Sequence, residues 1–176
     1  MTEHSFQLII RGELTDDRLE SLFEAGCDDA TLSSKGDTTF AEFDREGETM
    51  LEAVLSAIKD VESVDGMEVL HVEPDELVWA SEIADRTGRT RQSVDQLIKG
   101  KRGPGSFPQP ATHATRNPLW RWSDVESWFA AYEGGEPRPE RSLVIGAING
   151  ALQARHNLRE AAKPALRQAV TKLLAS

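Results

Sequence analysis

The chain has 176 residues, of which 39% are hydrophobic and 28% charged, a composition typical of a globular protein with one or two domains. No apolar run approaches the roughly 18 residues of a membrane-spanning helix. The acidic N-terminus lacks an apolar signal core, which argues against secretion. Cys27 is the single cysteine, which excludes an intrachain disulfide and a cysteine-based zinc site. These features predict a cytoplasmic protein with no membrane partner.

The formal net charge of −10 is unevenly distributed. Residues 1–76 contain 21 acidic and 5 basic residues, a net charge of −16. Residues 77–133 contain 6 acidic and 8 basic residues, a net charge of +2, whereas residues 134–176 contain 3 and 7, a net charge of +4. This asymmetry indicates an acidic N-terminal segment that is distinct from the rest of the chain.

The first 75 residues have the pattern of a βαββαβ unit. Apolar runs predict strands at 6–10, 28–33, 38–45 and 67–72. A first helix is capped by Thr15 and turns Leu19, Leu22 and Phe23 inward. A second helix carries an apolar stripe formed by Met50, Leu51, Val54, Leu55, Ile58 and Val61.

This order of elements indicates an α+β protein whose residues 1–75 form a ferredoxin-like domain. That architecture supports many unrelated functions. We interpret the domain as a dimerisation or protein-contact module. Small-ligand sensing in the manner of ACT-type regulatory domains is the alternative interpretation.

Residues 77–100 have the pattern of two short helices joined by a tight turn. Their apolar faces, spaced i, i+3, i+4, consist of Ala80, Ile83 and Ala84 in the first helix and Val94, Leu97 and Ile98 in the second. Gly88 supplies the positive φ that such a turn uses, and Thr90 is a good N-cap for the second helix. Gly100 is predicted to end that helix.

The outer face of the second helix carries polar and basic side chains. When the apolar residues point inward, Gln92, Gln96 and Lys99 point outward. Arg91 and Ser93 flank them at the N-terminal turn. Such side chains donate to phosphates or to base edges, since Arg suits guanine and Gln suits adenine. A solvated surface helix shows the same pattern.

Further elements follow this helix. Residues 101–105 form a basic, glycine-rich turn, and Phe107–Pro110 is extended because its prolines disfavour helix. Residues 112–116 and 119–122 are predicted to pair as a hairpin across Asn117 and Pro118.

Ser123–Glu126 has the sequence of a capping box that opens another helix. With the preceding elements, it resembles the winged helix-turn-helix of the MerR and excisionase-like DNA-binding proteins over residues 77–132. The residues that carry this resemblance are Ser81–Ala84, Gly88–Val94, Phe107–Pro108 and Trp120–Trp128. Two residues depart from it: Trp79 replaces the usual Ser or Thr cap, and Asp95 lies near the expected DNA side.

The resemblance implies binding to double-stranded DNA, with the second helix in the major groove and the wing on the backbone or minor groove. The predicted major-groove residues are Arg91, Gln92, Ser93, Gln96 and Lys99. The predicted phosphate or minor-groove residues are Arg89, Thr90, Lys101, Arg102, Arg116 and Arg121. Because a charge of +2 neutralises few phosphates, we expect a homodimer or cooperative oligomer. The acidic domain then either limits nonspecific DNA binding or attracts a basic protein partner.

Residues 134–141 have the composition of a linker. In the C-terminal segment, 142–176, Ser142 is predicted to cap a helix and Asn157 to begin a second one. Pro164 either kinks or restarts the last helix. These helices pack on their own chain or form a dimerisation arm. Their basic residues are interpreted as a solvated face: Arg155, Arg159, Lys163, Arg167 and Lys172.

No catalytic constellation is found in the sequence. The four histidines lack partners at metal-ligand spacing, and Gly103–Gly105 lacks the context of a phosphate loop, so no enzyme activity, metal or cofactor is predicted. The leading hypothesis is a DNA-binding transcriptional regulator that acts as an oligomer. The alternatives are an excisionase-like architectural factor that bends DNA, and a protein-interaction adaptor whose winged unit does not bind DNA.

Overall fold

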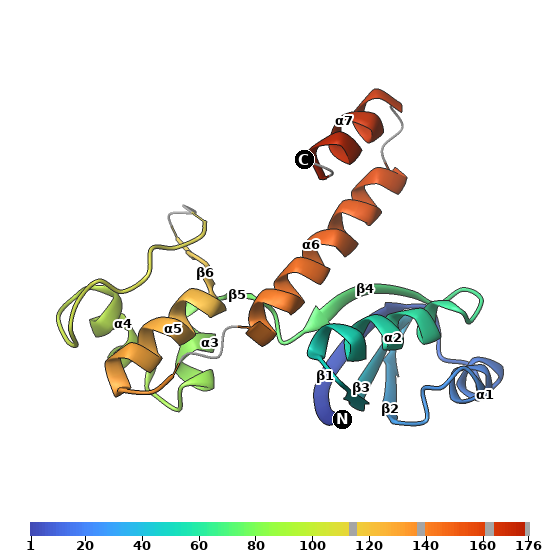
Figure 1. Cartoon of the computed structure of the whole chain (residues 1–176), viewed down its shortest axis with the longest axis horizontal. Coiled ribbons are helices and arrows are strands. Elements are labelled where there is room, and N and C mark those ends of the chain that lie inside the picture. Colours follow the sequence, from blue (N-terminus) through green and yellow to red (C-terminus); the bar gives the residue numbers. More distant parts are fainter. Residues whose placement is uncertain (113–115, 137–139, 161–163, 175–176) are drawn as a thin grey trace. The chain divides into compact units, whose positions relative to one another are not determined.

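The computed structural model describes residues 1–112, 116–136, 140–160 and 164–174. These residues form an α+β structure with two compact units. We call residues 1–73 with 147–176 the sheet unit, and residues 74–146 the central unit (Figure 1). None of the helices in the described residues combines the length and apolarity that crossing a membrane requires.

The sheet unit begins with the predicted βαββαβ order. Its elements are β1 (Thr2–Arg11), α1 (Asp16–Glu24), β2 (Ala30–Lys35), β3 (Thr38–Gly47), α2 (Met50–Glu62) and β4 (Glu68–Glu73). The sheet is antiparallel throughout, with the strand order β2-β3-β1-β4. The β2 and β3 strands close around Gly36 and Asp37, with Lys35 opposite Thr38, at the predicted turn.

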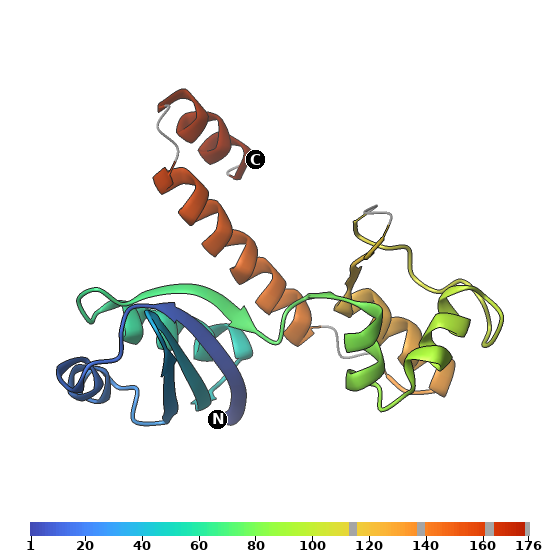
Figure 2. The ribbon, with the colours of Figure 1, turned by 180° about the vertical axis from the view of Figure 1, so that it is seen from behind.

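One face of this sheet is covered by α2 (Figure 1), and Figure 2 shows the other face toward the viewer with α2 behind it. Alternate strand residues point at α2 and are buried: Phe6, Leu8 and Ile10 in β1, and Ala41 and Phe43 in β3. The predicted α2 stripe is only partly correct, because Leu51 and Leu55 are 45% and 49% exposed. Ala53 and Ala57 take the inward positions, since small side chains let the helix approach the sheet closely.

The first helix, α1, buries less than its sequence predicts. Thr15 caps it as expected, because its Oγ1 accepts a hydrogen bond from the Arg18 N–H at 3.3 Å. Of its three predicted inward residues only Leu22 is buried, whereas Leu19 is 45% and Phe23 66% exposed. Figures 1 and 2 show the reason: α1 lies beside the sheet rather than across its face, so only one row of its side chains meets the core.

The second half of α6 (Glu140–Glu160) covers the open edge of β4. The Asn149 side chain accepts a hydrogen bond from the Val72 N–H at 2.8 Å and donates one to the Val72 carbonyl at 2.9 Å. Arg155 donates to the Val69 carbonyl at 2.8 Å and forms an ion pair with Glu62 at 2.6 Å. The interpretation of Arg155 as part of a solvated face is therefore wrong, because this edge offers it a carbonyl and a carboxylate.

The boundaries of the C-terminal helices also differ from the prediction. The α6 helix begins at Glu140, so Ser142 is a buried residue inside the helix and not its cap. It continues through Asn157, where a second start was predicted. Pro164 begins α7 (Pro164–Leu174), in agreement with the preference of proline for the first helical position. Part of the predicted linker, residues 137–139, lies outside the described residues.

The central unit contains short strands and short helices. They are β5 (Leu77–Val78), α3 (Ala80–Arg86), α4 (Arg91–Ile98), β6 (Trp120–Arg121), α5 (Trp122–Glu133) and the start of α6. Their core consists of Val78, Ile83, Ala84, Val94, Leu97, Phe107, Trp120, Val125 and Phe129. The β6 strand pairs with β5, with Trp120 opposite Val78. The predicted strand partner of 119–122 was 112–116, of which residues 113–115 are not described.

Arg45 is the central charged residue of the sheet unit. Arg45 is only 7% exposed, and its guanidinium holds Asp29 through two hydrogen bonds, of 2.8 and 2.9 Å. It also donates to Asp60 at 2.6 Å and to the Gly26 carbonyl at 2.5 Å. The cluster thereby ties β3 to the loop after α1 and to α2.

Replacing Arg45 with alanine is expected to destabilise the protein strongly. Because the Asp29 and Asp60 side chains are 29% and 27% exposed, water compensates only partly for the lost cation. We expect a loss of about 2–4 kcal/mol in the free energy of unfolding, measured with urea. In the control Arg11→Ala, the removed side chain is 49% exposed, so the expected loss is below about 1 kcal/mol. Equal losses in both variants would contradict the assigned role of Arg45.

Candidate nucleic-acid interface

The turn between α3 and α4 is held by backbone hydrogen bonds. Gly88 has a φ of +62°, as predicted, and its N–H donates to the Asp85 carbonyl at 3.2 Å. The next N–H, of Arg89, donates to the Ala84 carbonyl at 2.9 Å, which completes a Schellman motif. Thr90 then caps α4, because its Oγ1 accepts from the Ser93 N–H at 3.2 Å. The local sequence therefore sets the start of α4.

The inner and outer faces of α4 are clearly separated. Val94 and Leu97 are fully buried in the core of the central unit. Arg91, Gln92 and Lys99 are exposed. Of the other predicted major-groove residues, Ser93 and Gln96 are half-buried, as is Asp95. The structure thus brings the predicted groove-reading residues onto one helix, with the N-terminal turn and the C-cap most open to a partner.

The basic turn after α4 is fixed to the helix end. The Lys101 N–H donates to the Gln96 carbonyl at 2.9 Å, and the Gly100 N–H donates to the Leu97 carbonyl at 3.0 Å. Gly103 has a φ of +78°, and a Cβ there would lie 2.9 Å from a Leu97 methyl carbon. These contacts keep the exposed Lys101 and Arg102 next to the C-terminus of α4.

Aromatic side chains anchor the following segment. The buried Phe107 ring lies 4.9 Å from the Trp128 ring in an edge contact, and 6.4 Å from the Trp120 ring. The Trp128 indole N–H donates to the Gly105 carbonyl at 3.1 Å, and the Trp120 indole N–H donates to the Pro108 carbonyl at 3.1 Å. The aromatic residues in the sequence therefore hold the long connection on the core.

Two segments of the predicted wing region are joined by hydrogen bonds at Leu119. The Leu119 carbonyl accepts from the Ala111 N–H at 2.7 Å, and the Leu119 N–H donates to the Thr112 hydroxyl at 3.1 Å. Arg116 and Arg121, the two predicted wing contacts, are both exposed.

Two arginines of the central unit have internal partners. Arg89 forms an ion pair with Glu133 at 2.6 Å, and its guanidinium lies 5.2 Å from the centre of the Phe129 ring. Arg86 pairs with Glu82 and lies over the Trp122 ring at 5.0 Å. Arg89, a predicted phosphate contact, is thus held against α5 by packing and charge.

The other six basic residues between positions 77 and 133 lie outside these pairs. In the part of the chain that the structure describes, none of them forms an ion pair, and all six are exposed: Arg91, Lys99, Lys101, Arg102, Arg116 and Arg121. They include the cations of α4, of the basic turn and of the predicted wing. These six exposed cations therefore lie in the segments predicted to contact nucleic acid.

Sequence analysis missed Glu76, which caps α5. The predicted capping box at Ser123 is wrong, since Arg121 is the N-cap residue and α5 begins at Trp122, two residues before the predicted start at Asp124. The buried Glu76 accepts from the Ser123 hydroxyl at 2.5 Å, and its backbone carbonyl accepts from the Trp122 N–H at 2.7 Å. A carboxylate 47 positions away thus replaces the local cap, and no local spacing indicates this contact.

A second, half-buried carboxyl group lies in the same unit. One carboxyl oxygen of Glu126 and one of Glu76 are buried without a hydrogen-bond partner among the described residues. Burial raises the pKa of Glu126 above its ordinary value of 4.5, and the nearby Glu76 raises it further. A hydrogen bond with Ser142 and the charges of Arg141 and Arg86 oppose this change. Ser142 of α6 therefore bonds a carboxyl group whose ionised form is less favourable than it would be in water.

Replacing Glu126 with glutamine is expected to stabilise the protein at pH 7. Folding raises the pKa of Glu126, so its favourable contribution is complete below pH 4.5 and is lost as the pH rises through the raised pKa. Gln has no charge to bury, so the gain in unfolding free energy over the wild type should disappear below that pH. Urea unfolding of both proteins between about pH 3.5 and 7 measures this difference in the free energy of unfolding. An equal gain from Glu136→Gln, at an exposed position, would contradict this explanation.

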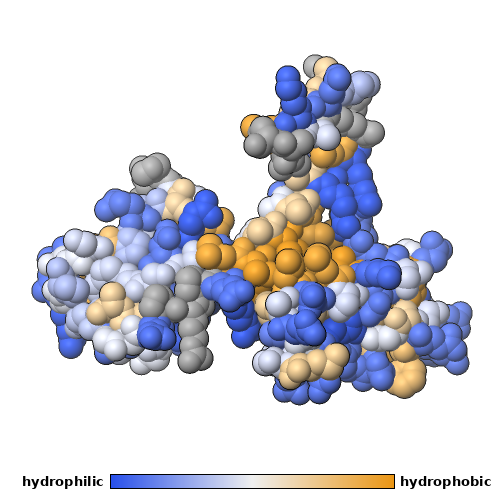
Figure 3. Space-filling model, viewed as in Figure 1, coloured by the Kyte–Doolittle hydropathy of each residue, from blue (hydrophilic) through white to orange (hydrophobic). Residues whose placement is uncertain are grey.

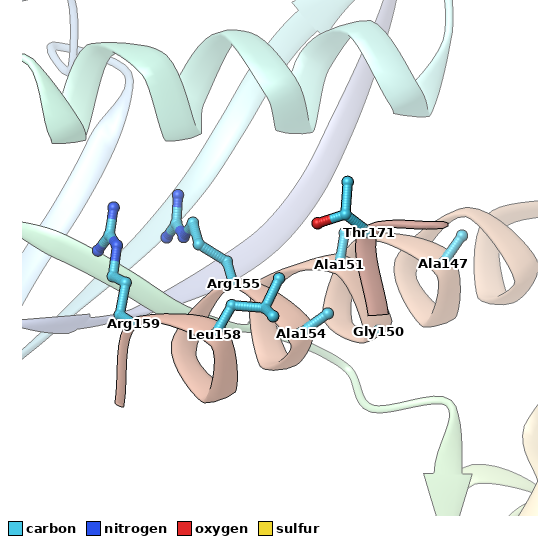
Figure 4. Close-up of a pocket in the computed structure, with 8 residues that line it drawn as sticks. All are labelled: Ala147, Gly150, Ala151, Ala154, Arg155, Leu158, Arg159 and Thr171. Carbon is cyan, nitrogen blue, oxygen red and sulfur yellow. The ribbon is translucent and has the colours of Figure 1, made fainter. Parts of the chain in front are cut away.

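A hollow of about 860 Å³ lies beside α6 in the sheet unit. Small and apolar residues of α6 line most of it, with Thr171 of α7 (Figure 4). Figure 4 shows Arg155 and Arg159 extending from the same side of α6, and both are engaged with carboxylates, Glu62 and Glu68. Figure 3 shows hydrophobic residues gathered where α6 lies in Figure 1. The hollow therefore offers apolar contacts without free charged groups.

Other reactive groups are weak candidates. Burial raises the pKa of the Cys27 thiol to about 11, so the thiolate that would act as a nucleophile is scarce near neutral pH. In the described residues, no group of three or more His, Cys, Asp or Glu side chains is arranged to hold a metal ion. No protein-family model matches this chain, and no match is found to a curated protein or to a solved structure.

Proposed function

We propose that the central unit is a winged helix-turn-helix that binds double-stranded DNA sequence-specifically, and that the protein is a transcriptional regulator acting as an oligomer. The α4 helix is the observation that carries this proposal. Its aliphatic side is buried, and its opposite side presents Arg91, Gln92 and Lys99 to solvent. Arg and Gln are the side chains best suited to bidentate contacts with guanine and adenine.

The dimensions of α4 support insertion into the major groove. An α-helix with its side chains is about 10–12 Å in diameter, and the major groove of B-DNA is about 12 Å wide, so α4 fits into it. Helices of this type present their N-terminal residues to the bases. Arg91 and Gln92 occupy that end, so we assign base contacts to them and peripheral contacts to the half-buried Ser93 and Gln96.

The remaining cations are assigned to the DNA backbone. Lys101 and Arg102 adjoin the C-terminus of α4, whereas Arg116 and Arg121 belong to the wing region. Arg89 is better described as a positioning residue, since its ion pair and ring contacts hold the start of α4 on α5. Thr90 also positions the start of α4, because its hydroxyl caps the helix. Thr90 is exposed, so a phosphate bound there has access to its side chain.

The charge balance supports an oligomer. Six exposed cations in one copy neutralise few phosphates, and two further arginines are consumed by internal ion pairs. Two or more copies on one site multiply the number of contacts. The sheet unit, whose strand order β2-β3-β1-β4 fits a ferredoxin-like fold, is proposed as the protein-contact module.

Replacing Arg91 with alanine tests the groove assignment. On a site selected from a random DNA pool, we expect a loss of about 1–3 kcal/mol in binding free energy and a relaxed sequence preference, because a base contact is removed. Fluorescence anisotropy with selected and scrambled duplexes measures both effects. Arg11→Ala, which removes an exposed arginine of the sheet unit, is the control and should bind as the wild type does. Unchanged binding by Arg91→Ala would show that α4 does not read bases.

Salt dependence tests the phosphate assignment. Lys101→Ala should weaken binding to all duplexes alike and make the slope of log K against log salt shallower by about 1. The measurement is a titration from 50 to about 300 mM salt with each variant. A wild-type chain that binds no duplex even at low salt would favour the protein-interaction adaptor, for which the internal pairing of Arg86 and Arg89 is the supporting observation.

A further inference from the structure

The sheet unit has a second hollow, between α1 and β2, with an apolar floor and an acidic rim. Its volume is about 570 Å³. The apolar lining includes Leu19, Phe23 and Leu32, and the rim carries Asp16, Glu20 and Asp28. Phe23 is 66% exposed, which is unusual for a large aromatic ring on a helix that belongs to a folded unit. An exposed apolar surface with polar surroundings is typical of a site for a protein partner.

The α7 helix has the complementary chemistry. Residues 164–174 contain two basic residues, Arg167 and Lys172, and no Asp or Glu. Their apolar residues recur with helical spacing along the sequence. Of the α7 side chains that the structure describes, Val170 is half-buried and the others are exposed, including Leu173 at 73%. The described side chains of α7, which include the cationic Lys172, are therefore mostly exposed to solvent.

We propose that α7 of a second copy of this chain docks in the hollow between α1 and β2. The aliphatic residues of α7 would cover Phe23 and Leu19, and Lys172 would face the carboxylates of the rim. Opposite charges on the two surfaces favour this pairing, whereas two hollows would repel each other through their rims. The occupant is therefore the helix of another copy and not a second α1.

The geometry of this contact has two consequences. The hollow and the helix are different surfaces, so the association is head to tail and adds copies one after another. The α7 helix has 11 residues and is about 16 Å long, so each contact is small compared with a stable interface. Association is then weak in free solution and becomes effective when neighbouring copies are held on one duplex. The docking itself involves only the sheet unit and does not depend on what α4 binds, whereas its effect on a duplex rests on the proposed function.

The first test is sedimentation equilibrium of the full chain at rising concentration and low salt. We expect self-association that weakens as salt rises. Phe23→Ser should lower the association constant at least roughly tenfold, as expected for a central aromatic contact. Leu55→Ser, which removes an apolar side chain of similar exposure on α2, is the control and should associate as the wild type does. A wild type that stays monomeric, or a Phe23→Ser variant that associates normally, overturns the proposal.

Charge reversal tests the identity of the occupant. Glu20→Lys and Lys172→Glu should each weaken association, and a single chain with both changes should recover it. An equimolar mixture of the two single variants should also associate, because each supplies the half that the other lacks. Additive losses in the double variant, or a mixture that stays monomeric, overturn docking between copies. Thermal unfolding of each variant verifies that these exposed positions leave the fold intact.

Binding to a duplex that holds only one copy distinguishes the DNA-binding proposal from the docking proposal. Phe23→Ser should bind it as the wild type does and should lose cooperativity on a duplex with several sites. Arg91→Ala should weaken DNA binding and keep self-association. Single-site binding without any self-association overturns only the docking proposal, whereas self-association without DNA binding overturns only the proposed function.

Discussion

The burial of the aliphatic side of α4 is the constraint on which the candidate interface depends. Val94 and Leu97 are fully buried against the aromatic core, so the helix cannot rotate without exposing them to water. At roughly 1.5–3 kcal/mol for each fully buried aliphatic side chain, this packing outweighs the small preferences of the polar residues on the other side. The orientation of Arg91 and Gln92 is therefore a consequence of core packing.

The aromatic core extends this control to the basic turn. Phe107 and Trp128 pack on each other, and the Trp128 indole bonds the backbone of Gly105, so a segment without regular secondary structure has a defined path. Arg89 and Glu133 join the start of α4 to the end of α5. Cations that would otherwise be distributed over a long loop are presented from a rigid base, which would reduce the conformational entropy lost in the proposed binding to phosphates.

Charge is used differently in the two units. In the sheet unit, Arg45 and Arg155 neutralise carboxylates inside the fold, and the remaining acidic residues leave its surface negative. In the central unit, most basic residues remain exposed. Within the sheet unit, Asn149 closes the edge of β4, whereas the hollow beside β2 stays open. One edge of the sheet is made unavailable for pairing, and the other side keeps the features of a contact surface.

The local pattern of the sequence determined the order of elements, the caps at Thr15 and Thr90, the turn at Gly88 and the inner face of α4. These features depend on residues within a few positions of one another, where backbone geometry and helical spacing decide the outcome. The tertiary structure alone decided that Leu19 and Phe23 are exposed, that Glu76 caps α5 and that Arg89 and Arg155 have internal partners. Each of these depends on which surfaces meet across long sequence separations, and a local pattern does not contain that information.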